Sequence, residues 1–451
     1  MGEARVKAPN IIVAGILNTK GENIKYIAKQ VEAAGGIPHI MELSLGEECG
    51  WADIPLHEVL WPTGKRPEKL FKLERAQACE FVTEGAVKTI VRLYEEGKVQ
   101  GVISVGGSMG TSIACTMMRA LPIGVPKMML STDASGEVGV HIGTRDLCML
   151  YPIAETGLNR ITRRILTYAA SGIVGMASAP EVEETENKPL IGCMMFGVTT
   201  PCVLRAQKHM EENGYEVMVN HCTGAGGQSM EEMIEEGHIV GMLDLTTEEV
   251  TADVFDTYYQ RSGPMRLRTA AKKGIPQVVS VGGSELMLFE GISDIPEKLM
   301  LEIQRGVRKL YNHNPSVACV AITLEETRAF AKEFCSRLAP ATAPTVICIP
   351  MRGWGGCDIA SPDLALGWSG EGPGATWIPG HNPLHSRRSE IMLEVLQEEL
   401  PHKDNIEVLV IDKHINEPEF SDVASEILTE MLSGTWKRGS HTELSYVSVL
   451  K

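Results

Sequence analysis

Short aliphatic and β-branched runs alternate with segments of helical apolar spacing through the first 180 residues. Such runs predict buried strands, because a strand covered on both faces carries apolar side chains throughout. A polar exit loop is expected at residues 18–22, whereas residues 44–72 show no clear pattern. Strands are predicted at residues 10–17, 37–43, 101–105 and 125–130, and helices at 23–34, at 74–96 and from Ser108. This alternation predicts a parallel sheet of right-handed βαβ units.

The alternation starts again beyond a polar, acidic stretch. We therefore predict an N-terminal lobe at residues 1–180, an acidic linker at 181–189 and a C-terminal lobe at 190–451. Within the second lobe, residues 352–387 form a long loop rich in Trp, Gly and Pro. The predicted fold class is α/β, with a mainly parallel sheet flanked by helices in each lobe.

Two segments of the first lobe recur in the second in the same order. Residues 95–104 align without gaps with residues 235–244, and residues 124–129 resemble residues 274–279. Ordered internal similarity predicts a duplication, which gives two related Rossmann-like lobes. The alternative is convergence, because helix–glycine–strand transitions resemble one another in unrelated α/β segments.

A glycine-rich turn, Gly106-Gly-Ser-Met-Gly-Thr111, follows the third predicted strand. Glycine permits a tight turn and close approach of a ligand. The predicted helix from Ser108 would present free N–H groups and the positive end of its dipole to an anion such as phosphate. The alternative is a strand-to-helix turn that uses glycine for geometry alone.

Polar residues end two other strands of the first lobe. Lys20 could neutralise phosphate charge, or it could be a solvated surface lysine. Residues 131–136 end the fourth strand, where Asp133 could hold Mg²⁺ or a ribose hydroxyl. The alternative for this segment is a turn closed by local Asp and Ser hydrogen bonds.

The second lobe carries acidic and histidine-containing loops instead. Asp244 and Glu248 occupy the position that matches the first lobe's glycine turn, and His313 and His414 lie in predicted polar loops. The four residues form a candidate acid–base, substrate-binding or metal group. The alternative for each histidine is burial with backbone partners. Residues 223–227 form a second possible anion turn.

Composition limits the partners. The formal net charge of −16 disfavours nucleic acid, because no basic field offsets the phosphates. No apolar run reaches the length of a membrane span, so no membrane association is expected. The eleven cysteines contain no Cys-x-x-Cys pair, which favours reduced thiols and a cytoplasmic location.

The chain resembles the tomato mosaic virus resistance protein-like ATP-binding domain family, from about residue 10 to residue 435. The residues that carry the resemblance lie at 15–21, 106–111, 134–136, 157–160, 195–201, 223–227, 244–248, 313–315 and 414–416. Two departures stand out. Asn18 replaces an aspartate usual in the family, and residues 353–387 diverge from the family's Gly-x-Ser-x-x-Asp segment.

The resemblance implies ATP bound to the first lobe and a dimer. We expect Mg²⁺ as the ion that would accompany ATP, and a homodimer or higher homo-oligomer. Carried over to this sequence, the phosphate-side residues are Thr19, Lys20, Gly106, Gly107, Ser108, Gly110 and Thr111, with Ala134, Ser135 and Gly136 beside them.

Three functions follow as hypotheses. The first is an ATP-dependent enzyme that holds a small polar metabolite on Asp244, Glu248, His313 and His414. The second is a nucleotide-gated binding or regulatory protein without turnover. The third is an ATP-independent hydrolase or lyase that uses the same second-lobe residues.

Overall fold

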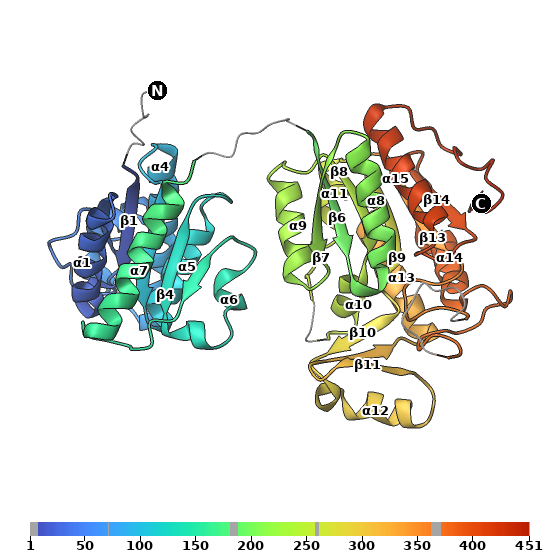
Figure 1. Cartoon of the computed structure of the whole chain (residues 1–451), viewed down its shortest axis with the longest axis horizontal. Helices are drawn as coiled ribbons and strands as arrows, with labels where there is room; N and C mark the ends of the chain where they lie inside the picture. Colours follow the sequence, from blue (N-terminus) through green and yellow to red (C-terminus); the bar gives the residue numbers. More distant parts are fainter. Residues whose placement is uncertain (1–7, 71, 181–187, 258–260, 362–370, 451) are drawn as a thin grey trace. The chain divides into compact units, whose positions relative to one another are not determined.

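The computed structural model describes residues 8–70, 72–180, 188–257, 261–361 and 371–450. The chain divides into two compact units, Met1–Glu183 and Glu184–Lys451, here called the N-domain and the C-domain. Each is a helix-flanked α/β domain with a mainly parallel sheet, which confirms the predicted fold class (Figure 1).

The N-domain sheet is parallel, with strand order β2-β1-β3-β4-β5. Its strands are β1 (Asn10–Gly15), β2 (Ile37–Glu42), β3 (Gly101–Gly106), β4 (Lys127–Ser131) and β5 (Cys148–Leu150). Its helices are α1 (Leu17–Ala33), α2 (Leu56–Leu60), η1 (Trp61–Thr63), α3 (Pro67–Leu70), α4 (Arg75–Glu95), α5 (Ser108–Arg119), η2 (Thr132–Ser135), α6 (Gly139–Ile142) and α7 (Arg160–Ala177).

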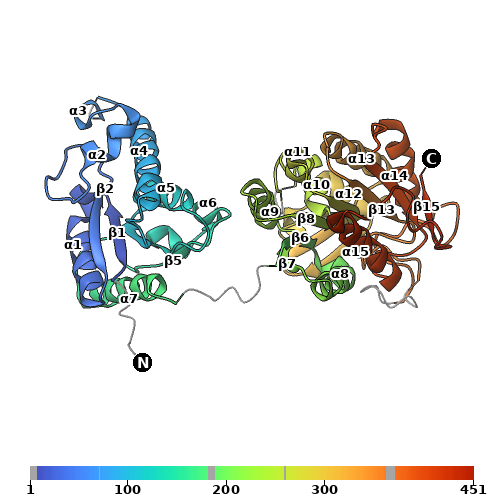
Figure 2. The same ribbon diagram turned by 90° about the horizontal axis from the view of Figure 1, so that it is seen from above.

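Alternation along β1 explains how this sheet is covered. Ile11 and Val13 pack in the core formed with α1 and α7, whereas Ile12 and Ala14 pack in the core formed with α4 and α5. Successive side chains of a strand point to opposite faces, so an all-apolar strand requires helices on both sides. Figure 2 shows α1 and α7 on one side of the sheet and α4 and α5 on the other.

The C-domain sheet has strand order β15-β14-β13-β9-β8-β6-β7, and only its edge strand β15 is antiparallel within that described sheet. Its strands are β6 (Leu190–Met195), β7 (Glu216–His221), β8 (Gly241–Thr246), β9 (Gln277–Gly282), β13 (Thr345–Pro350), β14 (Ile406–Ile411) and β15 (Val447–Val449). Its helices are η3 (Gly197–Thr199), α8 (Thr200–Glu212), α9 (Ala225–Glu235), α10 (Glu248–Val254), α11 (Arg268–Lys273), α13 (Leu324–Leu338), α14 (Arg387–Glu399) and α15 (Pro418–Ser433).

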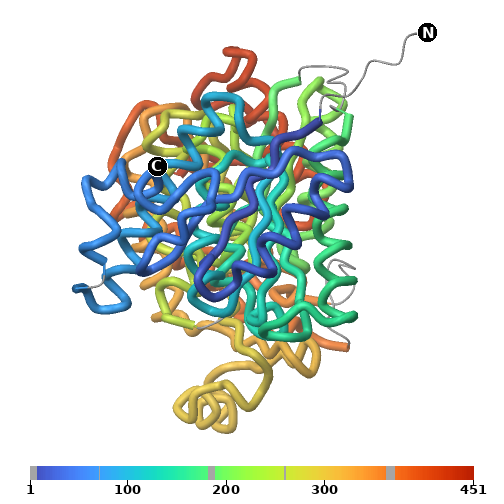
Figure 3. The backbone as a smooth tube through the Cα atoms, turned by 90° about the vertical axis from the view of Figure 1, so that its left-hand side faces the viewer, coloured from blue at the N-terminus to red at the C-terminus, as the bar shows by residue number. Residues whose placement is uncertain are grey.

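An insertion after β9 adds a small antiparallel sheet, β10-β12-β11, to the C-domain. It comprises β10 (Leu286–Phe289), η4 (Ile292–Asp294), α12 (Glu297–Gln304), β11 (Leu310–Asn314) and β12 (Val317–Ala321). The tube in Figure 3 shows this insertion protruding from its domain. His313, expected in a loop, instead lies on β11.

The two large sheets share one local order, β2-β1-β3-β4 in the N-domain and β7-β6-β8-β9 in the C-domain. In both sheets, the second strand of the domain lies on one side of the first strand, and the third strand lies on its other side. Ligands of open α/β sheets bind in the crevice at such a switch point, beyond the carboxyl ends of the strands. These crevices lie between β1 and β3 and between β6 and β8.

One local prediction is wrong. Residues 18–22 are not an exit loop, because α1 begins at Leu17 and the Ile16 carbonyl already accepts the amides of Thr19 and Lys20. The unassigned residues 44–72 contain short helices at Leu56–Leu60, Trp61–Thr63 and Pro67–Leu70. Among the described helices, none has the length and apolarity needed to cross a bilayer.

Candidate functional site

The N-domain crevice begins where β1 and β3 end. The backbone passes from β3 through Gly107, the N-cap of α5, and no side chain caps this twelve-residue helix. A Cβ on Gly110 would lie 3.7 Å from Ile16 Cδ1, so the first turn of α5 lies against the end of β1. The helix start therefore faces the switch point, as the glycine-rich turn predicts.

A carboxylate occupies part of this crevice. Lys20 Nζ donates to the Glu155 backbone carbonyl and also contacts the Glu155 carboxylate at 3.0 Å. A Cβ on Gly107 would lie only 2.9 Å from a carboxylate oxygen of Glu155. The Lys20 side chain is 8% exposed and that of Glu155 is 59% exposed. Hydrogen bonds from Lys20 and Thr132 and the Lys20 charge lower the pKa of Glu155, with Lys20 the larger cause.

A cavity of about 320 Å³ adjoins the same strand end. Ile16, Asn18 and Thr19 contribute its wall at the start of α1, and Arg75 contributes from the start of α4. Leu45, Leu70 and Leu73 supply an apolar part. The cavity thus combines polar groups next to the crevice with an aliphatic surface.

The remaining phosphate-side residues differ in availability. Ser108 is exposed in the first turn of α5. Thr111 is buried, donates to the Gly107 carbonyl at 2.9 Å and lies 2.6 Å from the Ser131 hydroxyl, so it fixes α5 to β4. In the turn after β4, the Ser135 hydroxyl donates to the Thr132 carbonyl and the Gly136 amide donates to the Asp133 carbonyl. Gly106, at the end of β3, packs against the α5 backbone at Gly110.

In the C-domain, Asp244 belongs to a buried ion cluster. The Arg266 guanidinium contacts both Asp244 oxygens, and it donates from Nε to Glu249 at 2.7 Å. Arg266 Nη1 also lies 3.7 Å from Glu231. Each side chain is at most 8% exposed. Asp244 is consequently engaged by a structural cation. Arg266 belongs to no sequence motif that would single it out.

The possible anion turn at residues 223–227 is already filled by Glu249. Its carboxylate accepts the Gly224 amide at 2.6 Å and the Gly227 amide at 3.1 Å. A carboxylate at the start of a helix satisfies the same free N–H groups and dipole that would otherwise attract phosphate. The expectation of an open anion turn there is therefore wrong.

Glu248 and Glu285 are fully buried, and none of their four carboxylate oxygens has a hydrogen-bond partner among the described residues. Burial raises the pKa of Glu248 well above its usual range, helped by the charges of neighbouring carboxylates. Burial, with Asp358 nearby, raises the pKa of Glu285 to about 8. Glu285 was missed by sequence reasoning because a single Glu after a Gly-Gly-Ser turn is no motif.

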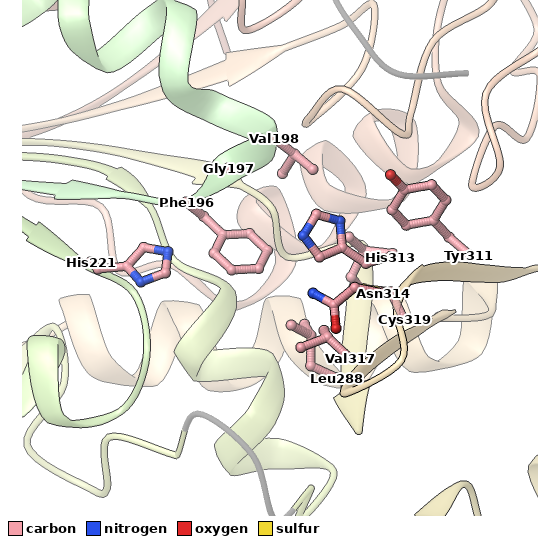
Figure 4. Close-up of a pocket in the computed structure, with 11 residues that line it drawn as sticks. Phe196, Gly197, Val198, His221, Leu288, Tyr311, His313, Asn314, Val317 and Cys319 are labelled. Carbon is pink, nitrogen blue, oxygen red and sulfur yellow. The ribbon is translucent and has the colours of Figure 1, made fainter. Parts of the chain in front are cut away.

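The two histidines have different surroundings. His414 is fully buried, accepts the Asn416 amide at Nδ1 and lies 3.1 Å from the Gly355 carbonyl through Nε2. Burial lowers the pKa of His414 to about 4, so its ring is neutral at pH 7 and held by the backbone. His313 is exposed on β11 and lines a cavity of about 150 Å³ (Figure 4).

The described residues include no group of three His, Cys, Asp or Glu side chains placed to hold a metal ion. His381 and His385 lie on a turn rather than a helix and bind Glu390 and Asp412 separately.

Comparison with known proteins gives a consistent assignment. Residues 9–182 match the N-terminal domain and residues 188–365 the C-terminal domain of an "Uncharacterised protein family (UPF0261)". A UPF0261 protein of Clostridium tetani is 35% identical over 94% of this chain and 98% of its own length. The ToMV susceptible protein tm-1(GCR26) of Solanum lycopersicum is 29% identical over 96% of this chain, which spans 57% of that longer protein.

Among solved structures, UDP-GlcNAc 2-epimerase from Neisseria meningitidis bound to UDP-GlcNAc is 10% identical. The match covers 60% of this chain and 82% of that one with a TM-score of 0.20, which is too low to carry an argument about function. The predicted resemblance to the tomato mosaic virus resistance proteins is confirmed by the sequence relatives.

Proposed function

Because the chain belongs to the UPF0261 family of uncharacterised proteins, we propose a function from its own geometry: the N-domain binds ATP in the crevice between β1 and β3. The observation that carries the proposal is the Glu155 carboxylate, held by Lys20 beside Gly107 at the start of α5. Groups that hold a carboxylate also suit a phosphate, which needs the same cation and free N–H groups. A phosphate would enter as the exposed Glu155 side chain moves out.

The adjoining cavity suits the rest of the nucleotide. Its volume of about 320 Å³ lies within the range of small-molecule sites. We propose that the base packs on Leu45, Leu70 and Leu73 while Thr19 and Arg75 face its polar substituents or the ribose. Mg²⁺ would bind mainly through the nucleotide's phosphates, as this ion commonly does.

An ATP-independent hydrolase or lyase has less support. Asp244 is engaged by Arg266, and both ring nitrogens of His414 are engaged by the backbone. Neither group is free to exchange a proton with a substrate. A chain that binds ATP either consumes it in a reaction or uses it to control the binding of another ligand without turnover. ATP consumption that depends on an added metabolite would identify the first.

Calorimetric titration of ATP into the full chain, with and without Mg²⁺, tests the proposal. Lys20→Ala removes a phosphate contact and should weaken ATP at least about tenfold, the equivalent of 1.4 kcal/mol. Lys29→Ala, at an exposed position of the same helix, should leave binding unchanged. Absence of ATP binding to the unaltered chain, or equal affinities for the two variants, would contradict the proposal.

A further inference from the structure

The cavity of about 150 Å³ in the C-domain lies between two separate parts of the fold. Phe196, Val198 and His221 reach it from the ends of β6 and β7, and Tyr311 and His313 reach it from β11 of the small antiparallel sheet. Figure 4 shows these side chains converging from the two parts, with Leu288, Val317 and Cys319 alongside. The insertion thus adds a wall beside the C-domain switch point.

Size and shape favour a single aromatic ring. A cavity of about 150 Å³ in another protein's apolar interior accommodates benzene. Four of the lining residues here are aromatic, and they form two pairs. The Phe196 and His221 rings are stacked with centroids 5.7 Å apart, and the Tyr311 and His313 rings are tilted with centroids 6.0 Å apart. Flat faces and edges of this kind pack well against another ring.

The lining disfavours an anionic ligand. None of the lining residues that the structure describes is Lys or Arg. Glu248 and Glu285 lie directly behind the lining. The Cβ of Glu248 and Cδ1 of Phe196 are respectively 3.4 and 3.5 Å from the Cβ position of Gly283. Glu285 precedes the lining residue Leu286. Burial raises the pKa of the Cys319 thiol, and the charges of both buried glutamates add to that rise.

Within the described part of the chain, these two carboxyl groups have no hydrogen-bond partner although they are fully buried. A buried carboxylate without a partner is costly, and a nearby cation offsets that cost. The charges of Arg266 and Arg388 act on Glu248 and Glu285 respectively, but the pKa of both carboxyl groups stays raised. An amine in the cavity would add a further positive charge near them and favour their ionised form, and Tyr311 and Asn314 offer polar atoms for orientation.

We propose that this cavity binds a small single-ring aromatic amine, with the ring between Phe196 and His313 and the amine toward Glu248 and Glu285. The site is separate from the proposed ATP crevice, because every lining residue belongs to the C-domain. A negative result for this cavity would therefore not affect the ATP proposal.

Three isosteric probes test the proposal on the unaltered chain, with nucleotide omitted. Benzylamine is cationic, benzyl alcohol neutral and benzoate anionic at pH 7. Calorimetry with ligand-observed NMR should show benzylamine binding at least about fivefold more tightly than benzyl alcohol, and benzoate should not bind. Benzoate binding as tightly as benzylamine, or no binding of any probe, would overturn the proposal.

Two variants locate the bound probe. Val317→Trp fills the cavity from β12 and should weaken benzylamine at least about tenfold, whereas Val307→Trp makes the same change at a position that is 60% exposed and should have no effect. Glu248→Gln should reduce the preference for benzylamine over benzyl alcohol and leave benzyl alcohol itself unchanged. Equal binding by the two tryptophan variants, or an unaltered preference in Glu248→Gln, would overturn the assignment. Should Val317→Trp fail to fold, the three-probe ranking decides alone.

Discussion

The two switch-point crevices have the same strand order but different side chains at the start of the helix that follows. In the N-domain, α5 starts with Ser108 and carries no acidic residue in its first turn. In the C-domain, the matching helix α10 starts with Glu248 and Glu249, both fully buried. Two sheets of the same local strand order thus differ in the side chains of the first helical turn, and we propose that this difference leaves only the N-domain helix start open to anions.

The two domains also hold their internal carboxylates differently. Glu155, in the N-domain, has an exposed side chain and one cationic partner, Lys20. Glu249, in the C-domain, is fully buried and is held by Arg266 and two backbone amides. We propose that the first arrangement exchanges its carboxylate for another anion, whereas the second is part of the core.

The largest expected effect is the loss of stability when the buried cation is removed. Arg266→Met leaves Asp244 and Glu249 buried without their cationic partner, so the free energy of unfolding of the C-domain should fall by about 3–5 kcal/mol. Urea unfolding followed by circular dichroism measures it. Arg205→Met breaks an exposed pair with Asp422 and should cost at most about 1 kcal/mol. Similar losses of unfolding free energy in both variants would show that the buried Arg266 cluster stabilises the C-domain no more than an exposed ion pair does.

Next in size is the pH dependence caused by Glu285. Its pKa of about 8 in the folded state exceeds the unfolded value of 4.5, so only the folded state keeps the proton between these limits. Its contribution to stability is complete below about pH 4.5 and is lost as pH rises toward 8, with a slope of at most about 1.4 kcal/mol per pH unit.

Glu285→Gln should flatten the decline in unfolding free energy between pH 5 and pH 8, as measured by urea titrations at several pH values. Glu290→Gln, at an exposed position, serves as the control and should keep the slope of the unaltered chain. A slope that Glu285→Gln leaves intact would mean that Glu285 ionises normally.

A smaller effect is expected from removing the N-domain's own carboxylate. Glu155→Gln eliminates the negative group that competes with phosphate for Lys20, so ATP should bind about five- to tenfold more tightly in a calorimetric titration. Glu84→Gln, in an exposed pair on α4, should not change the affinity. Weaker ATP binding in Glu155→Gln would mean that Glu155 assists the nucleotide, for example through Mg²⁺.

Local sequence patterns predict the two mainly parallel sheets, because β-branched runs and helical spacing report burial directly, but they do not predict the small antiparallel sheet. The position of α5 after Gly107 was also predictable, since glycine followed by an apolar helical pattern marks a strand-to-helix turn. Residues 18–22 were mistaken for a loop because Asn18, Thr19 and Gly21 are poor helix formers, yet the helix includes them.

The site was less predictable because its charges meet only in three dimensions. Lys20 and Glu155 are 135 positions apart, and Arg266 reaches Asp244 across 22. The cavity depends on the insertion between β9 and β13, whose short strands carry no distinctive motif. Sequence patterns identify individual polar residues at strand ends, but they do not reveal which of these residues already have partners.

Hydrogen exchange measured by mass spectrometry, on the full chain with and without ATP and Mg²⁺, tests the contrast between the two crevices most directly. ATP should slow exchange of the amides at residues 107–111 and leave residues 223–227 unchanged, since Glu249 already holds amides of that turn. Protection at residues 223–227 without any at 107–111 would contradict the account.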